Sequence, residues 1–293
     1  MLRPVLRIAP LIGLLAAAFA CAGPPAPAVQ VDASPHRIVS LTPALTEILF
    51  AIGAGDRVVG VTQYCDFPPE AAAKPKVGGY VNPSVESVLA LKPDLILVSP
   101  GPGNRDAALA MRRAGLRLEI VPAETLEESL AAIELVAGFA GAESTGRDLA
   151  AAVRARLDAV AKRVAGTPRV RTLFCIQTEP IFAAGRDTLP SQLLELAGGT
   201  NVISASRYPR LDVEAVAAAR PELILQARMD LADGAPHAED AFWKRWPSIP
   251  AVAHGRVVVL RDDLTLRPGP RVADAAEELA AILHGDTERK SAR

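Results

Sequence analysis

The chain has 293 residues, of which 50% are apolar and 22% charged, and its 32 basic and 33 acidic side chains leave a formal net charge of −1. This composition excludes an intrinsically disordered protein, and the length is sufficient for two domains. A nucleic-acid-binding protein should show a basic excess, which this chain lacks, so no nucleic-acid partner is predicted.

The first 20 residues have the pattern of a signal peptide. Arg3 and Arg7 precede the apolar run IAPLIGLLAAAFA, which ends at Cys21. A basic start, a short apolar core and small residues at the end are typical of an export signal, and the run is short for a membrane span. The Ala20-Cys21 pair fits a lipoprotein processing site and predicts a lipid anchor on Cys21. Ordinary signal cleavage at the same place is the alternative.

Short runs rich in Val, Ile and Leu predict strands that are buried on both faces, as in parallel sheets. They lie at residues 37–41, 58–62, 94–99, 116–121, 171–176, 222–227 and 256–260. Helical patterns occur between them, at residues 46–53, 85–92 and 105–115. This alternation indicates α/β architecture.

The alternation stops between Pro122 and Pro168, where the chain has no proline and its pattern is helical throughout. A break is expected at residues 138–141. Beyond it, an apolar stripe recurs at helical spacing on Leu149, Val153, Leu157, Val160 and Val164. Residues 143–165 as one helix would be about 35 Å long.

A stretch of 13 residues occurs twice in the chain. Residues 85–97 are VESVLALKPDLIL and residues 213–225 are VEAVAAARPELIL, with eight identical positions. In each copy a helix ends at a basic residue followed by proline, which cannot continue a helix, and a buried strand follows. Ser84 and Asp212 are suited to cap the two helix starts. The repeat therefore predicts two similar lobes joined by one long helix, with a ligand cleft between them.

These patterns predict the fold class as α/β, with two Rossmann-like lobes whose sheets are mostly parallel. The expected segments are a signal peptide (1–20), a Pro/Ala tether (21–35), an N-terminal lobe (36–122), a helical linker (123–167), a C-terminal lobe (168–286) and a frayed tail (287–293). Export permits a disulfide, but Cys65 lies in a predicted loop and Cys175 in an apolar strand, so we expect two thiols that are not joined.

With this organisation the chain resembles the periplasmic solute-binding proteins of ABC importers for cobalamin and iron complexes. The resemblance runs from His36 to His284 and is carried by RIVSLTPALTEILFAIGAGDRVVGVT, YCDFPPEAAAKPKVGGY, the LKPDLIL repeat, AGGTNV and PGPRVADAAEELAAIL. It implies a periplasmic monomer that captures a large ring-containing ligand and delivers it to an ABC permease dimer with its ATPase subunits. It also implies that no bond is made or broken and that no cofactor is needed.

The resemblance implies ligand contacts at aromatic and charged positions. The family's cobalamin binders hold the corrin between aromatic side chains. The expected contacts here are Tyr64, Tyr80, Phe182, Tyr208, Asp263, Arg267 and Arg271. Independently of the family, all three tyrosines of the chain lie just after a strand or just before a repeat helix, where a cleft rim is expected. A tyrosine has a flat apolar face and a polar edge, which suit a ligand that is part ring and part amide. Partly exposed loop ends are the alternative explanation.

The identity of the ligand stays open between three candidates. Cobalamin or a related corrinoid is the first, and a ferric siderophore and heme are the alternatives. The family's cobalamin binder has tryptophans at several cleft positions, whereas Ser99-Pro100-Gly101 replaces one aromatic segment here. Trp243 and Trp246 lie in FWKRWPSIP and are expected to pack structurally.

Glu86 and Glu214 are the acidic pair of the repeat. In the resembling family one Glu of each lobe docks onto arginines of the permease, and the same role is expected here. The alternative is helix electrostatics, because a Glu in the first turn of a helix is favoured by roughly 0.3–1 kcal/mol.

No metal site and no catalytic site is predicted. The four histidines are not clustered with cysteines or with one another at ligand spacing. Ser40 lacks the flanking glycines of a serine nucleophile elbow, and Gly101-Pro102-Gly103 lacks the remainder of a nucleotide-binding loop. An enzyme or a sensor that uses the cleft without a transporter is the alternative from another class, since a fold does not fix a function.

Overall fold

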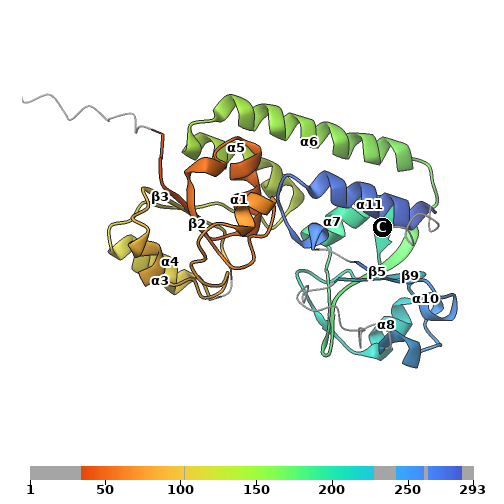
Figure 1. Cartoon of the computed structure of the whole chain (residues 1–293). Coiled ribbons are helices and arrows are strands. Elements are labelled where there is room, and N and C mark those ends of the chain that lie inside the picture. Colours follow the sequence, from red (N-terminus) through yellow and green to blue (C-terminus); the bar gives the residue numbers. More distant parts are fainter. Residues whose placement is uncertain (1–33, 102, 228–241, 261–262, 286–293) are drawn as a thin grey trace, which may run out of the picture. The chain divides into compact units, whose positions relative to one another are not determined.

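The computed structural model describes residues 34–101, 103–227, 242–260 and 263–285. From Ser34 onward the chain forms one compact unit (Figure 1). The predicted signal peptide, Cys21, most of the predicted tether and the predicted tail lie outside the described residues. None of the described helices is both long enough and apolar enough to cross a membrane.

The first lobe contains a four-stranded parallel sheet in the order β2-β1-β3-β4. Its strands are β1 (Ile38–Ser40), β2 (Val58–Val61), β3 (Leu95–Val98) and β4 (Leu118–Ile120). Its helices are α1 (Pro43–Ala51), η1 (Gly55–Arg57), α2 (Pro69–Ala72), α3 (Val85–Ala90) and α4 (Arg105–Arg113). Every residue of β1 and β3 is buried, which confirms for these two strands the prediction that both faces are covered. Strand β4 ends in the exposed Ile120, and the residues of β10 are only partly buried.

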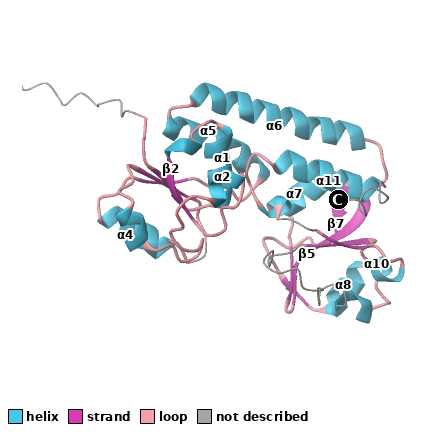
Figure 2. Cartoon of the chain, viewed as in Figure 1, coloured by secondary structure: helices cyan, strands magenta, loops and turns pink. Residues whose placement is uncertain are grey.

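The second lobe contains a six-stranded sheet, and Figure 2 shows it with helices beside it. Its strands are β5 (Val170–Thr178), β6 (Ile181–Ala183), β7 (Gly199–Asn201), β8 (Arg210–Leu211), β9 (Leu223–Gln226) and β10 (Val257–Val259). Its helices are α7 (Leu189–Leu196), α8 (Val213–Ala219), η2 (Trp243–Arg245), α10 (Pro250–Ala253), η3 (Leu264–Leu266) and α11 (Val272–His284). Strands β10, β9, β5 and β7 pair in parallel, while β6 is antiparallel to β5 and β8.

Two helices connect the lobes. Helix α5 (Leu126–Ala140) ends at Gly141, whose φ of 67° is the left-handed conformation that glycine adopts without a steric cost. Helix α6 (Glu143–Val164) follows as one uninterrupted helix of 22 residues, which confirms the predicted break and the predicted long helix. Its buried side chains include Val153, Leu157 and Val160 of the predicted stripe.

The two lobes share one apolar core. Helix α6 packs against α5 and against α11, and α5 also contacts α1 and α7 (Figure 1). A single cluster of buried side chains therefore runs from Leu45 on α1 through Ile133 and Leu157 to Leu193 and Leu279. At the surface of this packing, Arg156 on α6 lies 2.5 Å from Asp274 and 2.9 Å from Glu277 on α11.

The repeat is a duplicated backbone unit. Ser84 accepts a hydrogen bond from the Ser87 amide and Asp212 accepts one from the Ala215 amide, which confirms both predicted caps. The basic residue before each proline ends the helix in the same way, because Lys92 and Arg220 both have a φ of 47°.

The repeat also fixes each helix to its sheet. Asp94 accepts hydrogen bonds from the backbone amides of His36 and Arg37, and Glu222 accepts one from the amide of Arg171. The side chains of Arg37 and Arg171 in turn donate to the last carbonyl groups of α3 and α8, at Leu91 and Ala219. The repeated charges therefore serve the joint between helix and strand.

Candidate ligand-binding site

Exposed apolar side chains gather at the carboxyl ends of the first lobe's strands. Tyr64 follows β2 and is 53% exposed, Ile120 is the last residue of β4 and is 46% exposed, and Val81 precedes α3 and is 49% exposed. Ligands of open parallel sheets bind at this edge. The sequence analysis selected Tyr64 but missed Val81 and Ile120, because exposure at a strand end depends on the neighbouring loops.

Tyr80 lies across the loop that follows β3. Its hydroxyl donates to the Pro100 carbonyl at 3.0 Å, and its ring occupies the space into which a side chain at position 101 would project. The ring of Tyr80 therefore packs against the Ser99-Pro100-Gly101 segment, which itself has no aromatic side chain. Burial raises the pKa of Tyr80, and the nearby Glu124 carboxylate raises it further.

Tyr208 of the second lobe lies near the same carboxylate. Burial raises the pKa of Tyr208, and Glu124 is again the second cause. Glu124 lies in the segment between β4 and α5. Tyr80, against the loop after β3, and Tyr208, next to the partner of Glu124, are related by the repeat at a separation of 128 residues.

Arg207 completes this group of residues. Its Nη1 lies 3.2 Å from Glu124 Oε2 and so joins the second lobe to the end of the first. The backbone of Arg207 has a φ of 59°, and its amide donates to Asp187 Oδ1 at 2.5 Å. This hydrogen bond is the main reason why the pKa of Asp187 lies below its usual value.

Phe182 lies on the short strand β6 and is half-buried. Its register partner on β8 is Arg210, two residues beyond Tyr208. The pairing of β6 with β8 therefore holds Phe182 beside the residues that follow Tyr208 in the chain. No contact between the two rings is present among the described residues.

A buried network of charges lies beside Tyr64. Glu47 on α1 has a side chain that is 2% exposed. It accepts hydrogen bonds from Arg267 Nη1 at 3.1 Å and from Arg271 Nε and Nη2 at 2.8 and 2.6 Å. The guanidinium of Arg271 also lies 3.9 Å from the ring centre of Phe67.

Arg267 is the second centre of this network. It lies 2.6 Å from Asp66 and 2.6 Å from Asp263, and it contacts the Tyr64 carbonyl at 3.5 Å. Burial alone would raise the pKa of Asp66, but the hydrogen bond and the charge of Arg267 outweigh it and hold this pKa below its usual value. The carboxylates likewise raise the pKa of Arg267 against the effect of burial.

The network attaches the segment before α11 to the first lobe. The sequence analysis predicted Asp263, Arg267 and Arg271 as ligand contacts, and the structure commits their charged groups largely to one another and to Glu47. No sequence signal indicated Glu47, which lies in an apolar helical pattern.

Glu86 and Glu214 occupy equivalent places in the two lobes. Each lies in the first turn of a repeat helix, on α3 and α8, and each is exposed. Neither carboxylate forms an ion pair with another residue of the described ranges. Both are therefore available to a partner.

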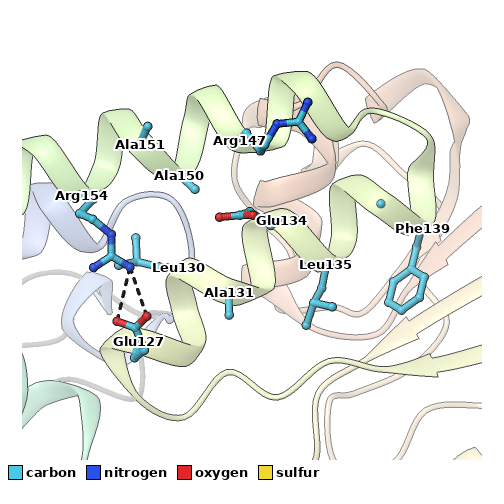
Figure 3. Close-up of a pocket in the computed structure, with 11 residues that line it drawn as sticks. Glu127, Leu130, Ala131, Glu134, Leu135, Phe139, Arg147, Ala150, Ala151 and Arg154 are labelled. Atoms are coloured by element: carbon cyan, nitrogen blue, oxygen red, sulfur yellow. Dashed lines mark hydrogen bonds and ion pairs between the residues drawn. The ribbon is translucent and has the colours of Figure 1, made fainter.

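Two further features lie apart from these residues. A hollow of about 820 Å³ lies between α5 and α6. Figure 3 shows its lining residues, with the ion pair of Glu127 and Arg154 among them. Its lining comes from these two helices and includes none of the predicted ligand contacts. Trp243 is fully buried and donates to Gln226, which confirms its predicted packing role.

The described residues meet neither the requirements of a disulfide nor those of a metal site. Neither Cys65 nor Cys175 forms a disulfide, as the sequence analysis expected. Among the described residues, no group of three or more His, Cys, Asp or Glu side chains is placed to hold a metal ion.

Sequence comparisons identify relatives over most of the chain. The sequence pattern of a family described as "Periplasmic binding protein" matches residues 38–264. The chain is 31% identical over 252 residues to the vitamin B12-binding protein of Vibrio cholerae, covering 85% of this chain and 89% of that protein. It is also 31% identical over 267 residues to the uncharacterized ABC transporter substrate-binding lipoprotein YvrC of Bacillus subtilis, covering 88% and 83%.

Solved structures show the same architecture. The periplasmic vitamin B12-binding protein BtuF of Vibrio cholerae matches with a TM-score of 0.73 and 31% identity, covering 85% of this chain and 96% of that one. The heme-binding protein BhuT in complex with two hemes matches with a TM-score of 0.76 and 29% identity, covering 85% and 98%. A periplasmic heme-binding protein of Pseudomonas aeruginosa matches with a TM-score of 0.77 and 28% identity, covering 85% and 93%.

Proposed function

The chain belongs to the periplasmic binding protein family, and from this premise we propose that it captures cobalamin or a related corrinoid between its lobes for an ABC importer. The observation that carries the proposal is the ion pair of Glu124 and Arg207, which joins the segment after β4 to the residue before Tyr208, while Tyr80 lies against the loop that follows the neighbouring strand β3. The vitamin B12-binding relatives, which are 31% identical over most of the chain, support the choice of ligand.

The chemistry of the tyrosines suits a corrinoid. Their rings provide flat apolar surface for the macrocycle. The hydroxyl group of Tyr208 can donate a hydrogen bond to an amide carbonyl group at the edge of the ring. The hydroxyl group of Tyr80 donates to the Pro100 carbonyl and can accept a hydrogen bond from an amide NH₂ group of the ligand. Tyr64, Val81 and Ile120 extend the apolar surface on the first lobe, and Phe182 extends it on the second.

Heme is the second candidate, and the similarity to two heme-binding proteins at 28–29% identity favours it. An axial bond from tyrosine to ferric iron requires the phenolate. Burial and the charge of Glu124 both oppose the loss of that proton from Tyr80 and Tyr208. We place the corrinoid before heme because the vitamin B12-binding relative is 31% identical to this chain, against 28–29% for the two heme-binding proteins.

Asp263, Arg267 and Arg271 act in this proposal mainly as a support. Their network holds the Tyr64 carbonyl and the loop around Asp66 in place. Asp263 has the more exposed side chain of the Asp263–Arg267 pair, at 26% against 8%, and it is the member that can also reach a ligand.

A binding titration tests the ligand. Cyanocobalamin, heme and a set of ferric siderophores are added separately to the mature protein, and affinity is measured by calorimetry. We expect cyanocobalamin to bind most tightly, and Tyr80→Ala and Tyr208→Ala each to weaken it about tenfold, since a buried aromatic contact is worth upward of 1 kcal/mol. Leu135→Ala is the control, because Leu135 is exposed on α5 and lines the separate hollow. Tighter binding of heme than of cyanocobalamin would contradict the proposal.

We propose that Glu86 and Glu214 dock onto a permease dimer, and that export and a lipid on Cys21 bring the protein to it. The exposed, equivalent positions of the two carboxylates support this role. Glu86→Lys and Glu214→Lys should abolish ligand uptake by cells while the purified protein keeps its affinity. Retained uptake would argue against docking. Lipidation is tested by Cys21→Ser, which should release the protein from the membrane fraction.

A further inference from the structure

Arg207 has a backbone conformation that does not suit its side chain. A φ of 59° is left-handed, and a residue with a Cβ adopts it at a steric cost that glycine avoids. Two hydrogen bonds to one loop impose it. The Arg207 amide donates to Asp187 Oδ1 at 2.5 Å, and the Arg207 carbonyl accepts from the Gly185 amide at 2.6 Å.

The loop around Gly185 has no room to relax this arrangement. A side chain at position 185 would meet the backbone oxygens of Ala205 and Arg207. The conformation of Arg207 is therefore fixed by its surroundings, and the position requires a left-handed residue. Strain of this kind that the surrounding structure maintains is common at ligand sites.

The charged end of Arg207 contributes little to stability in return. Its side chain is 71% exposed and its partner Glu124 is 50% exposed. An ion pair so open to solvent contributes little, because water screens both charges. Within the described ranges, Nη1 is the nitrogen that the structure engages, so most of the donor fork of the guanidinium faces solvent.

The position of this cation connects it to the ligand. Arg207 directly precedes Tyr208, and its charge acts on the phenol of Tyr208 together with those of Glu124 and Asp187. Its partner Glu124 also acts on Tyr80. Because Arg207 adjoins Tyr208 in the chain and lies 3.2 Å from Glu124, a ligand held at Tyr208 would lie within reach of the guanidinium, which binds phosphate and carboxylate groups through parallel hydrogen bonds.

We propose that Arg207 is a switchable anion-binding residue of the ligand site, paired with Glu124 in the empty protein and turned to an anionic group at the edge of the bound ligand. The inference rests on the proposed function and adds a charge requirement to it. The phosphodiester of the cobalamin nucleotide loop and the propionates of heme supply the same chemistry. Glu124 competes with this anionic group for the guanidinium. A ligand without an anionic group cannot displace Glu124 and gains no affinity from Arg207.

A comparison of two corrinoids, one with and one without the anionic group, tests whether Arg207 recognises that group. Cyanocobalamin carries the phosphodiester, and dicyanocobinamide has the corrin ring without it. Arg207→Gly fits the left-handed backbone and keeps the amide that Asp187 binds, so the variant removes the cation alone. Calorimetry should show about tenfold weaker binding of cyanocobalamin, the size of a hydrogen bond to a charged group, and unchanged binding of dicyanocobinamide. Glu124→Gln should strengthen cyanocobalamin binding.

Arg186→Gln is the matched control, because it removes an equal charge from the loop to which the Arg207 backbone is hydrogen-bonded. An equal loss of affinity in this variant would show general electrostatic attraction and overturn the switch. An equal loss for both corrinoids in Arg207→Gly, or a loss for neither, would also overturn it. If the wild-type protein binds heme and no corrinoid, the corrinoid proposal fails by itself. In that case heme is compared with its dimethyl ester, which lacks free carboxylates. Arg207→Gly should then weaken the binding of heme and leave the binding of the ester unchanged, and any other result overturns the switch.

Discussion

Glu47 is the acidic centre of the buried charge network, and we predict that Glu47→Gln strongly destabilises the protein. The carboxylate is 2% exposed and accepts three hydrogen bonds from Arg267 and Arg271. An amide in its place has one accepting oxygen and no charge, and its NH₂ group would face the two guanidinium groups. The substitution therefore leaves positive charge buried without compensation.

The size of the effect follows from what each arginine retains. Removal of one partner from a buried ion pair costs about 3–5 kcal/mol. Arg267 keeps Asp66 and Asp263, and the side chain of Arg271 is 23% exposed, so we expect the lower end, about 3 kcal/mol. At about 2–4 °C per kcal/mol for a protein of this size, the thermal midpoint should fall by about 6–12 °C.

Circular dichroism during thermal and urea unfolding measures this change. Glu277→Gln is the control, since it removes a carboxylate that pairs with Arg156 at the surface, where the side chain of Glu277 is 42% exposed. That variant should lose about 1 kcal/mol or less. Equal losses in the free energy of unfolding for the two variants would refute the reasoning, because burial of the charge would then make no difference.

Three further predictions concern Asp66 of the charge network, Gly101 beside Tyr80 and the apolar core that the lobes share. The pKa of Asp66 is lower in the folded protein than its usual 3.8, so its contribution to stability is present above that pH and is lost as the pH falls through the folded value. Asp66→Asn should therefore weaken the acid dependence of unfolding, measured from pH 6 to pH 2. Gly101→Ala should displace the Tyr80 ring and weaken ligand binding several-fold in calorimetry, with little change in the thermal midpoint, since the displaced atoms are the end of a side chain. Small-angle scattering should show a small change on ligand binding, and a large compaction would contradict the shared core.

The strands and helices with strong local patterns were predictable from the sequence. The seven apolar runs all contain strands, and the break before α6 falls where Gly141 ends α5. The short strands β6, β7 and β8 were missed, because none of them lies in a run rich in Val, Ile and Leu. Their pairing depends on β5, which is distant in sequence.

The candidate site was predictable in part. The tyrosines stand out in the sequence, being few and placed at strand ends. Glu124 does not stand out, because its contact with Arg207, the residue before Tyr208, depends on the fold of both lobes. The conformation of Arg207 depends on Asp187 and on the crowded backbone at Gly185, which the sequence around Arg207 does not reveal.

The duplication places the proposed ligand contact of each lobe close in the chain to its proposed docking residue. Tyr80 precedes Glu86 by six residues and Tyr208 precedes Glu214 by six, and the joints made by Arg37 and Arg171 fasten both repeat helices to their sheets. Each lobe therefore moves its tyrosine and its carboxylate together. In the proposed docking, a tilt between the lobes on ligand binding would change the separation of Glu86 and Glu214, and a symmetric partner that holds both carboxylates would then distinguish the loaded protein from the empty one.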